Sequence, residues 1–120
     1  MRSVSNLQMA SGTIAPVNPL VVIKRLVLRG SLQFSEKARH EMDIDSLTAD
    51  EVAESIVNAR RVEKVVRSTS ALRRHAGEKL YIIKSRSFDG TLIYTKGTIV
   101  NQAGEDIFYI LVSAKIATSE

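Results

Sequence analysis

The segment TADEVAESIVNARRVEKVVR, residues 48–67, contains the change of pattern that decides the fold. Thr48 and Glu51 form a capping box, in which each side chain accepts a hydrogen bond from a free backbone N–H at the start of a helix. The apolar residues after Glu51 share one helical face, which predicts a helix to about Ala59. After Arg61 the pattern alternates at every second residue, which is typical of a β-strand. Helix is therefore expected to give way to sheet at this point of the chain.

Two further helices are expected before this segment. Asn18 and Pro19 have the residue types of an N-cap and a first helical position, and Gly30 stands where a helix would end. The residues between them are rich in β-branched side chains, so a strand is the alternative, but their apolar positions fit one helical face better. Ser35 can cap a second, short helix that runs to Met42.

Four strands are expected after the change of pattern. They cover residues 62–67, 78–85, 91–100 and 107–116. Strands that follow one another through short connections favour an antiparallel meander. Because the helices come first, we expect an α+β fold, with two or three N-terminal helices packed on one face of an antiparallel sheet of about four strands.

Length and composition limit the kind of protein. A chain of 120 residues forms one domain, which we place at 18–120 behind a disordered tail over 1–17. The absence of cysteine excludes a disulfide framework and fits a reducing cytoplasm. No apolar run reaches the ~20 residues that cross a bilayer, and the N-terminus lacks the pattern of a signal peptide. We therefore expect a cytoplasmic protein without a membrane partner.

Positive charge is concentrated in one part of the chain. Residues 60–96 hold ten Lys and Arg against three acids, a net +7, whereas the whole chain has +4. Cations gathered on a small sheet suit a polyanion, and nucleic acid is the first partner to consider. His40 and His75 are far apart and no thiol is present, so no metal site and no small-molecule cofactor are expected.

RNA cleavage needs only residue types that this basic region contains. The ribose 2′-hydroxyl attacks the neighbouring phosphate, so the protein supplies a base, an acid and cations. Glu78, a tyrosine and two or more lysines or arginines can fill these roles, and clustered cations are expected to lower the pKa of a neighbouring tyrosine. The alternative for each residue alone is structural, because lysines near strand ends extend to water and tyrosines are common in strands.

From Val22 to Ala117 the chain resembles the MqsR-type toxins of bacterial type II toxin–antitoxin systems. The matching segments, in chain order, are VIKRLVLRG (22–30), the helix from Thr48 followed by VEKVVRS (62–68), GEKLY (77–81), TLIY (91–94) and VSAK (112–115). Uncharacterised relatives of that family share the strings EKLYIIK (78–84) and IYTKG (93–97) even more closely.

The resemblance implies a RelE-like fold and an mRNA endoribonuclease that inhibits translation and is silenced by a cognate antitoxin protein. Its site residues correspond to Lys64, Tyr94 and Lys115, and Glu78 stands where the family has a glutamine. Lys64 and Lys115 would hold the scissile phosphate, and Tyr94 or Glu78 would take and give the protons. The residues expected to guide the RNA backbone are Arg67, Arg73, Arg74, Lys84, Arg86 and Lys96. The alternative is a non-catalytic RNA- or protein-binding regulatory module.

Overall fold

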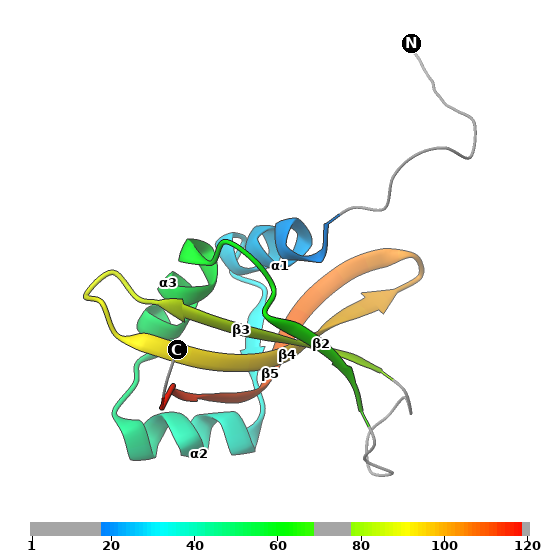
Figure 1. The fold of residues 1–120 in the computed structure, drawn as a ribbon. Helices are drawn as coiled ribbons and strands as arrows, with labels where there is room; N and C mark the ends of the chain where they lie inside the picture. Colours follow the sequence, from blue (N-terminus) through cyan, green and yellow to red (C-terminus); the bar gives the residue numbers. More distant parts are fainter. Residues whose placement is uncertain (1–17, 69–77, 119–120) are drawn as a thin grey trace.

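The computed structural model describes residues 18–68 and 78–118 (Figure 1). The tail expected over residues 1–17 lies outside these ranges, as does most of the basic loop with Arg73 and Arg74. The helices and strands are, in chain order, α1 (Pro19–Leu28), β1 (Leu32–Phe34), α2 (Glu36–Asp45), α3 (Ala49–Asn58), β2 (Lys64–Arg67), β3 (Lys79–Arg86), β4 (Leu92–Gln102) and β5 (Glu105–Ile116).

The described strands form one mixed sheet in the order β1-β5-β4-β3-β2. β2 to β5 form the expected antiparallel meander, and the α+β class is confirmed. β1 was not expected. It has three residues and pairs in parallel with the middle of β5, with Leu32 opposite Tyr109.

The helices begin where the sequence predicts them. The Asn18 side chain accepts a hydrogen bond from the Leu20 backbone N–H at 2.9 Å, so the first segment is a helix and not a strand. Both hydrogen bonds of the capping box are present at the start of α3, between Thr48 and Glu51. Gly30, just after α1, has φ +84°, a conformation that glycine adopts without strain.

Two helices, α1 and α3, cover one face of the sheet (Figure 1). Their Ile23 and Ile56 side chains are fully buried with Ile83, Ile93 and Tyr109 of β3, β4 and β5. Apolar residues at alternate strand positions thus form the core with an apolar helical face. Two of the expected two or three helices thus pack on one face of the sheet, and α2 lies elsewhere.

Helix α2 lies along the edge of β5, beyond the point where β1 ends (Figure 1). Its Glu41 carboxylate accepts hydrogen bonds from the Ser113 hydroxyl at 2.7 Å and the Ala114 backbone N–H at 3.0 Å. Its Asp45 carboxylate accepts one from the Ile116 backbone N–H at 2.8 Å. Two side chains of a helix therefore bind the backbone of β5 at positions that a neighbouring strand would otherwise occupy.

Candidate nucleic-acid interface

Three of the expected residues form one row across the sheet. Tyr94 of β4 is the cross-strand partner of Lys84 of β3 on one side and of Lys115 of β5 on the other. Directly opposed residues share a face of the sheet, with Cβ atoms about 4.5–5.5 Å apart. The Lys115 ammonium lies 5.5 Å from the centroid of the Tyr94 ring, within the range of a cation–π contact. The row points away from α1 and α3.

The next row along the strands adds two more lysines to this face. Lys64 of β2, Ile82, Lys96 and Ser113 are successive cross-strand partners. Lys96 lies two positions after Tyr94 on β4. Lys64 lies two strands away from β4, with β3 between them, which corresponds to roughly 10 Å. Lys64, Lys84, Lys96 and Lys115 therefore share the open face with one tyrosine.

Glu78 and Arg67 do not join this group. Glu78 precedes β3 by one residue and lies six positions before Lys84, which corresponds to roughly 20 Å along the strand. The Arg67 side chain lies on the opposite face of β2 from Lys64 and Val66. This is the face of the sheet that carries Tyr81. Burial and the charge of Asp106 raise the pKa of Tyr81, and the nearby Arg67 guanidinium partly offsets this rise.

A hollow of about 530 Å³ lies at the Lys115 end of the row. We call it the tyrosine hollow; its lining residues are Asp45, Lys84, Tyr94, Lys115, Ile116, Ala117 and Thr118. Asp45 comes from the last turn of α2, and its bond to Ile116 holds it against β5 at the wall of this hollow. The sequence reading missed this residue. The spacing of Glu41 and Asp45, one helical turn apart, was the available signal.

The Tyr94 phenol has a shifted pKa. Burial raises the pKa of Tyr94, and the negative charge of Glu41 raises it further. The expectation that clustered cations would lower this pKa was wrong, because burial and the carboxylate on α2 both raise it. The phenol is therefore protonated throughout the physiological pH range.

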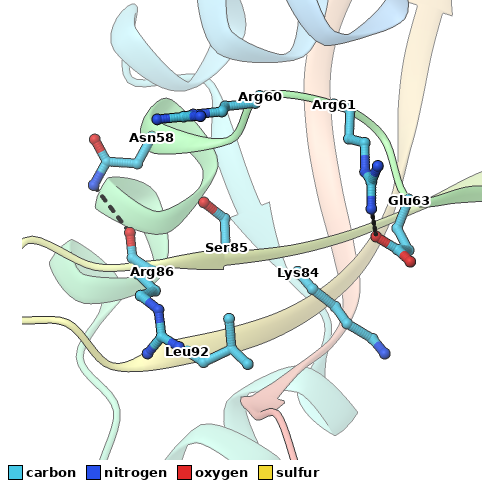
Figure 2. A pocket seen from close by; sticks show the side chains of 8 residues that line it. All are labelled: Asn58, Arg60, Arg61, Glu63, Lys84, Ser85, Arg86 and Leu92. Carbon is cyan, nitrogen blue, oxygen red and sulfur yellow. Dashed lines mark hydrogen bonds and ion pairs between the residues drawn. The ribbon is translucent and has the colours of Figure 1, made fainter. Parts of the chain in front are cut away.

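A second hollow, of about 580 Å³, lies beside the open part of the β3 edge (Figure 2). We call it the arginine hollow; its lining residues are Asn58, Arg60, Arg61, Glu63, Lys84, Ser85, Arg86 and Leu92. The Asn58 side chain donates to the Arg86 carbonyl at 2.9 Å, and the Arg86 guanidinium donates to the Gly90 carbonyl at 2.8 Å. Arg60 and Arg61 were not among the expected RNA-binding residues. They are adjacent at the junction of α3 and β2, and both line this hollow.

No helix in residues 18–68 and 78–118 combines the length and the apolar character needed to cross a bilayer. In the same ranges no cluster of three or more His, Asp or Glu side chains offers a set of metal ligands. No family model, curated protein or solved structure matches the chain. Lys84 lines both hollows and connects them across the open face of the sheet.

Proposed function

We propose that the protein is an endoribonuclease that cuts messenger RNA through the ribose 2′-hydroxyl, at the tyrosine hollow. The observation that carries this proposal is the row of Lys84, Tyr94 and Lys115 with Asp45 at its end. These four side chains supply one carboxylate, one protonated phenol and two ammonium groups within a single hollow. Cleavage through the 2′-hydroxyl transfers the phosphorus from the 5′-oxygen of one ribose to the 2′-oxygen of its neighbour. This reaction uses a base, an acid and cations, and the four side chains include all three.

Each group has a distinct part in the reaction. The Asp45 carboxylate removes the proton of the 2′-hydroxyl, whose oxygen then bonds to phosphorus. Asp45 already accepts a bond from Ile116, but a carboxylate can accept several hydrogen bonds. The bond from phosphorus to the 5′-oxygen breaks, and the Tyr94 phenol gives that oxygen its proton. Lys84 and Lys115 stabilise the charge that develops on the two remaining phosphate oxygens. The products end in a 2′,3′-cyclic phosphate and a 5′-hydroxyl.

The toxin role extends this proposal from the chemistry to the cell. The resemblance to MqsR-type toxins, with the RelE-like fold it implies, supports messenger RNA as the substrate and inhibition of translation in the cytoplasm as the result. It also implies a cognate antitoxin that silences the enzyme. Expression in a bacterial host should then arrest growth, and Tyr94→Phe should abolish the arrest.

Cleavage of a long messenger RNA in buffer containing EDTA tests the proposal. Fragments should carry 2′,3′-cyclic phosphate and 5′-hydroxyl ends. Asp45→Asn and Tyr94→Phe should each lower the single-turnover rate by about 10²- to 10⁴-fold, the usual contribution of a positioned base or acid. Lys115→Ala should lower it by about 10²-fold or more.

Lys79→Ala is the matched control. Lys79 is an exposed lysine of β3 whose side chain lies on the opposite face of the sheet from Lys84. Its loss therefore removes the same charge from the other face. Its rate should stay close to that of the wild type. Fragments with 3′-hydroxyl ends, or equal rates for Lys79→Ala and Lys115→Ala, would contradict the mechanism. RNA binding without fragments would instead favour the non-catalytic RNA-binding module.

A further inference from the structure

The arginine hollow lies beside the part of β3 that extends beyond its pairing with β2. β2 pairs with β3 only as far as Lys64 opposite Ile82, whereas β3 continues to Arg86. In the described part of the chain, no strand pairs with this last stretch of the β3 edge. The segment 59–63, which joins α3 to β2, passes beside it and forms the other wall of the hollow (Figure 2).

The hollow is strongly cationic. Four basic residues line it, Arg60, Arg61, Lys84 and Arg86, against one carboxylate, Glu63. Arg61 contacts Glu63 at 3.4 Å, and Figure 2 shows Arg60 reaching in the other direction, toward the end of α3. Guanidinium groups bind phosphate oxygens through paired, charge-assisted hydrogen bonds. Their exposure at the mouth of the hollow leaves them accessible to a large ligand.

The strand edge adds a backbone donor to these cations. Ile82 is paired with β2, and backbone groups of alternate residues in a strand point to the same edge. The N–H of Lys84 therefore points to the hollow. The carbonyl of Lys84 points to the same edge, and the carbonyl of Arg86 is already bound by Asn58. Such a combination of fixed amides and guanidinium groups favours an anion.

The two hollows are joined through one residue. Lys84 lines both of them, and it is also the β3 member of the row that contains Tyr94. An RNA strand that extends from Tyr94 along this row passes from β4 to β3, a distance of about 4.8 Å. It then reaches the arginine hollow at the β3 edge. The cations are thus arranged along a path and not around a point.

We propose that the arginine hollow is a second phosphate subsite, which binds a phosphodiester flanking the one that is cut. This inference rests on the proposed function and deepens it, because it defines the substrate as a single-stranded RNA of several nucleotides. A dinucleotide fills the tyrosine hollow alone. A longer strand also reaches Arg60 and Arg61, and gains affinity from them.

Binding of non-cleavable 2′-O-methyl RNA of two and of eight nucleotides, followed by fluorescence anisotropy, tests this subsite. The double variant Arg60→Gln/Arg61→Gln should weaken binding of the eight-nucleotide RNA by about tenfold or more and leave the dinucleotide unaffected. The slope of log K against log salt should fall by about 0.7 for each lost phosphate contact of a single strand. In cleavage assays, the KM for long RNA should rise while the rate for a dinucleotide stays constant.

Two control variants sharpen this test. Lys24→Gln/Arg25→Gln removes two charges from α1, outside either hollow, and should leave the difference between the two RNA lengths intact. Glu63→Gln removes the single carboxylate of the arginine hollow and should tighten binding of the longer RNA. Because this variant predicts a gain, damage to the fold cannot imitate the expected result.

The possible failures are distinguishable. If the wild type cuts RNA but Arg60→Gln/Arg61→Gln affects both RNA lengths equally, or behaves as the α1 control does, the subsite is wrong and the nuclease stands. If Glu63→Gln leaves binding of the longer RNA unchanged, the subsite is also wrong. If the wild type neither binds nor cuts RNA of any length, both proposals fail together.

Discussion

Gly97 allows β4 and β5 to approach closely beside the row of lysines and tyrosine. A Cβ at this position would lie 2.7 Å from Cζ of the Tyr109 ring and 2.9 Å from the Ile110 carbonyl oxygen. Both neighbours are fixed, one in the core and one in the backbone of β5, so neither can move away easily. The pairing of β4 with β5 also shifts register between Lys96 and Gly97, which is typical of a bulge. A glycine here is therefore a packing requirement.

Gly97→Ala should lower the free energy of unfolding by about 1–3 kcal/mol, the usual cost of overpacking a core. Urea denaturation followed by circular dichroism measures the change. Gly97→Ala/Tyr109→Leu should be less destabilised than the sum of its two single variants, because the smaller side chain relieves the clash. Simple additivity of the two effects would show that the close contact with Tyr109 is not the cause.

The pKa of Tyr94 can be measured without any catalytic assay. The difference in ultraviolet phenolate absorbance between the wild type and Tyr94→Phe should show ionisation above the ordinary value of 10.0, since burial and Glu41 both disfavour the phenolate. In Glu41→Gln the pKa should fall, because one negative charge is removed. A Tyr94 pKa below 10 in the wild type would contradict the effect given to burial and Glu41.

Among the elements, α2 is held to the sheet by its acidic side chains. Burial tends to raise the pKa of Glu41, but the hydrogen bonds from Ser113 and Ala114 and the Lys37 ammonium together lower it below its usual 4.5. A carboxyl with a depressed pKa in the folded state stabilises the protein above its unfolded pKa. This stabilisation is lost as the pH falls through the lower, folded-state pKa.

Glu41→Gln should therefore reduce the free energy of unfolding at pH 7, by about 1–3 kcal/mol for the loss of charge-assisted hydrogen bonds. The difference from the wild type should shrink when the pH is lowered below about 4.5, where the wild-type carboxyl begins to be protonated. Thermal unfolding at several pH values measures this. Glu105→Gln removes an exposed carboxylate from β5, the strand that Glu41 binds, and should show little effect at any pH. A loss that is independent of pH would contradict the role given to the charge.

The elements with local signals could be predicted, and those that depend on distant partners could not. The capping box of α3 and the proline and glycine around α1 are recognisable because the residues that satisfy the helix ends are neighbours in sequence. β1 has only three residues and forms against a strand far along the chain. The last hairpin turn was expected over 101–106 but is shorter, with Ala103 and Gly104 at φ 53° and 82° between β4 and β5.

The same distinction holds for the site. The period of two in β3, β4 and β5 indicated that Lys84, Tyr94 and Lys115 lie on strands, and their common row follows from the register. Asp45 was missed, because its one-turn spacing from Glu41 indicates a shared helical face but not how α2 docks against β5. Glu78 was grouped with Tyr94, but the register that pairs Tyr94 with Lys84 leaves Glu78 roughly 20 Å away along the strand, and this register cannot be read from the sequence pattern.

At the scale of the whole molecule, the core and the charge lie on opposite faces of one sheet. The apolar residues of β3 to β5 face α1 and α3, and the alternate positions carry Lys84, Lys96 and Lys115. The sheet can thus present a rigid row of cations without placing any of them in the core. Rigid strands position catalytic groups better than loops do.

A non-cleavable RNA that binds this face should stabilise the entire fold. At a free concentration 100 times its dissociation constant, a ligand specific for the native state adds about 2.7 kcal/mol to the free energy of unfolding. The 2′-O-methyl eight-nucleotide RNA should raise the midpoint of thermal unfolding in the wild type. Lys64→Ala/Lys96→Ala should reduce this rise, whereas Lys79→Ala should preserve it. Equal shifts in both variants would place the RNA on a different surface.

The docking of α2 on β5 also bears on how copies of the protein avoid one another. An uncovered strand edge is a template on which a second chain can add its own strand, and repeated addition leads to fibrils. Glu41 and Asp45 occupy the backbone N–H groups of Ala114 and Ile116 that such a chain would need. The helix that brings a carboxylate to the tyrosine hollow thereby also guards the sheet against polymerisation.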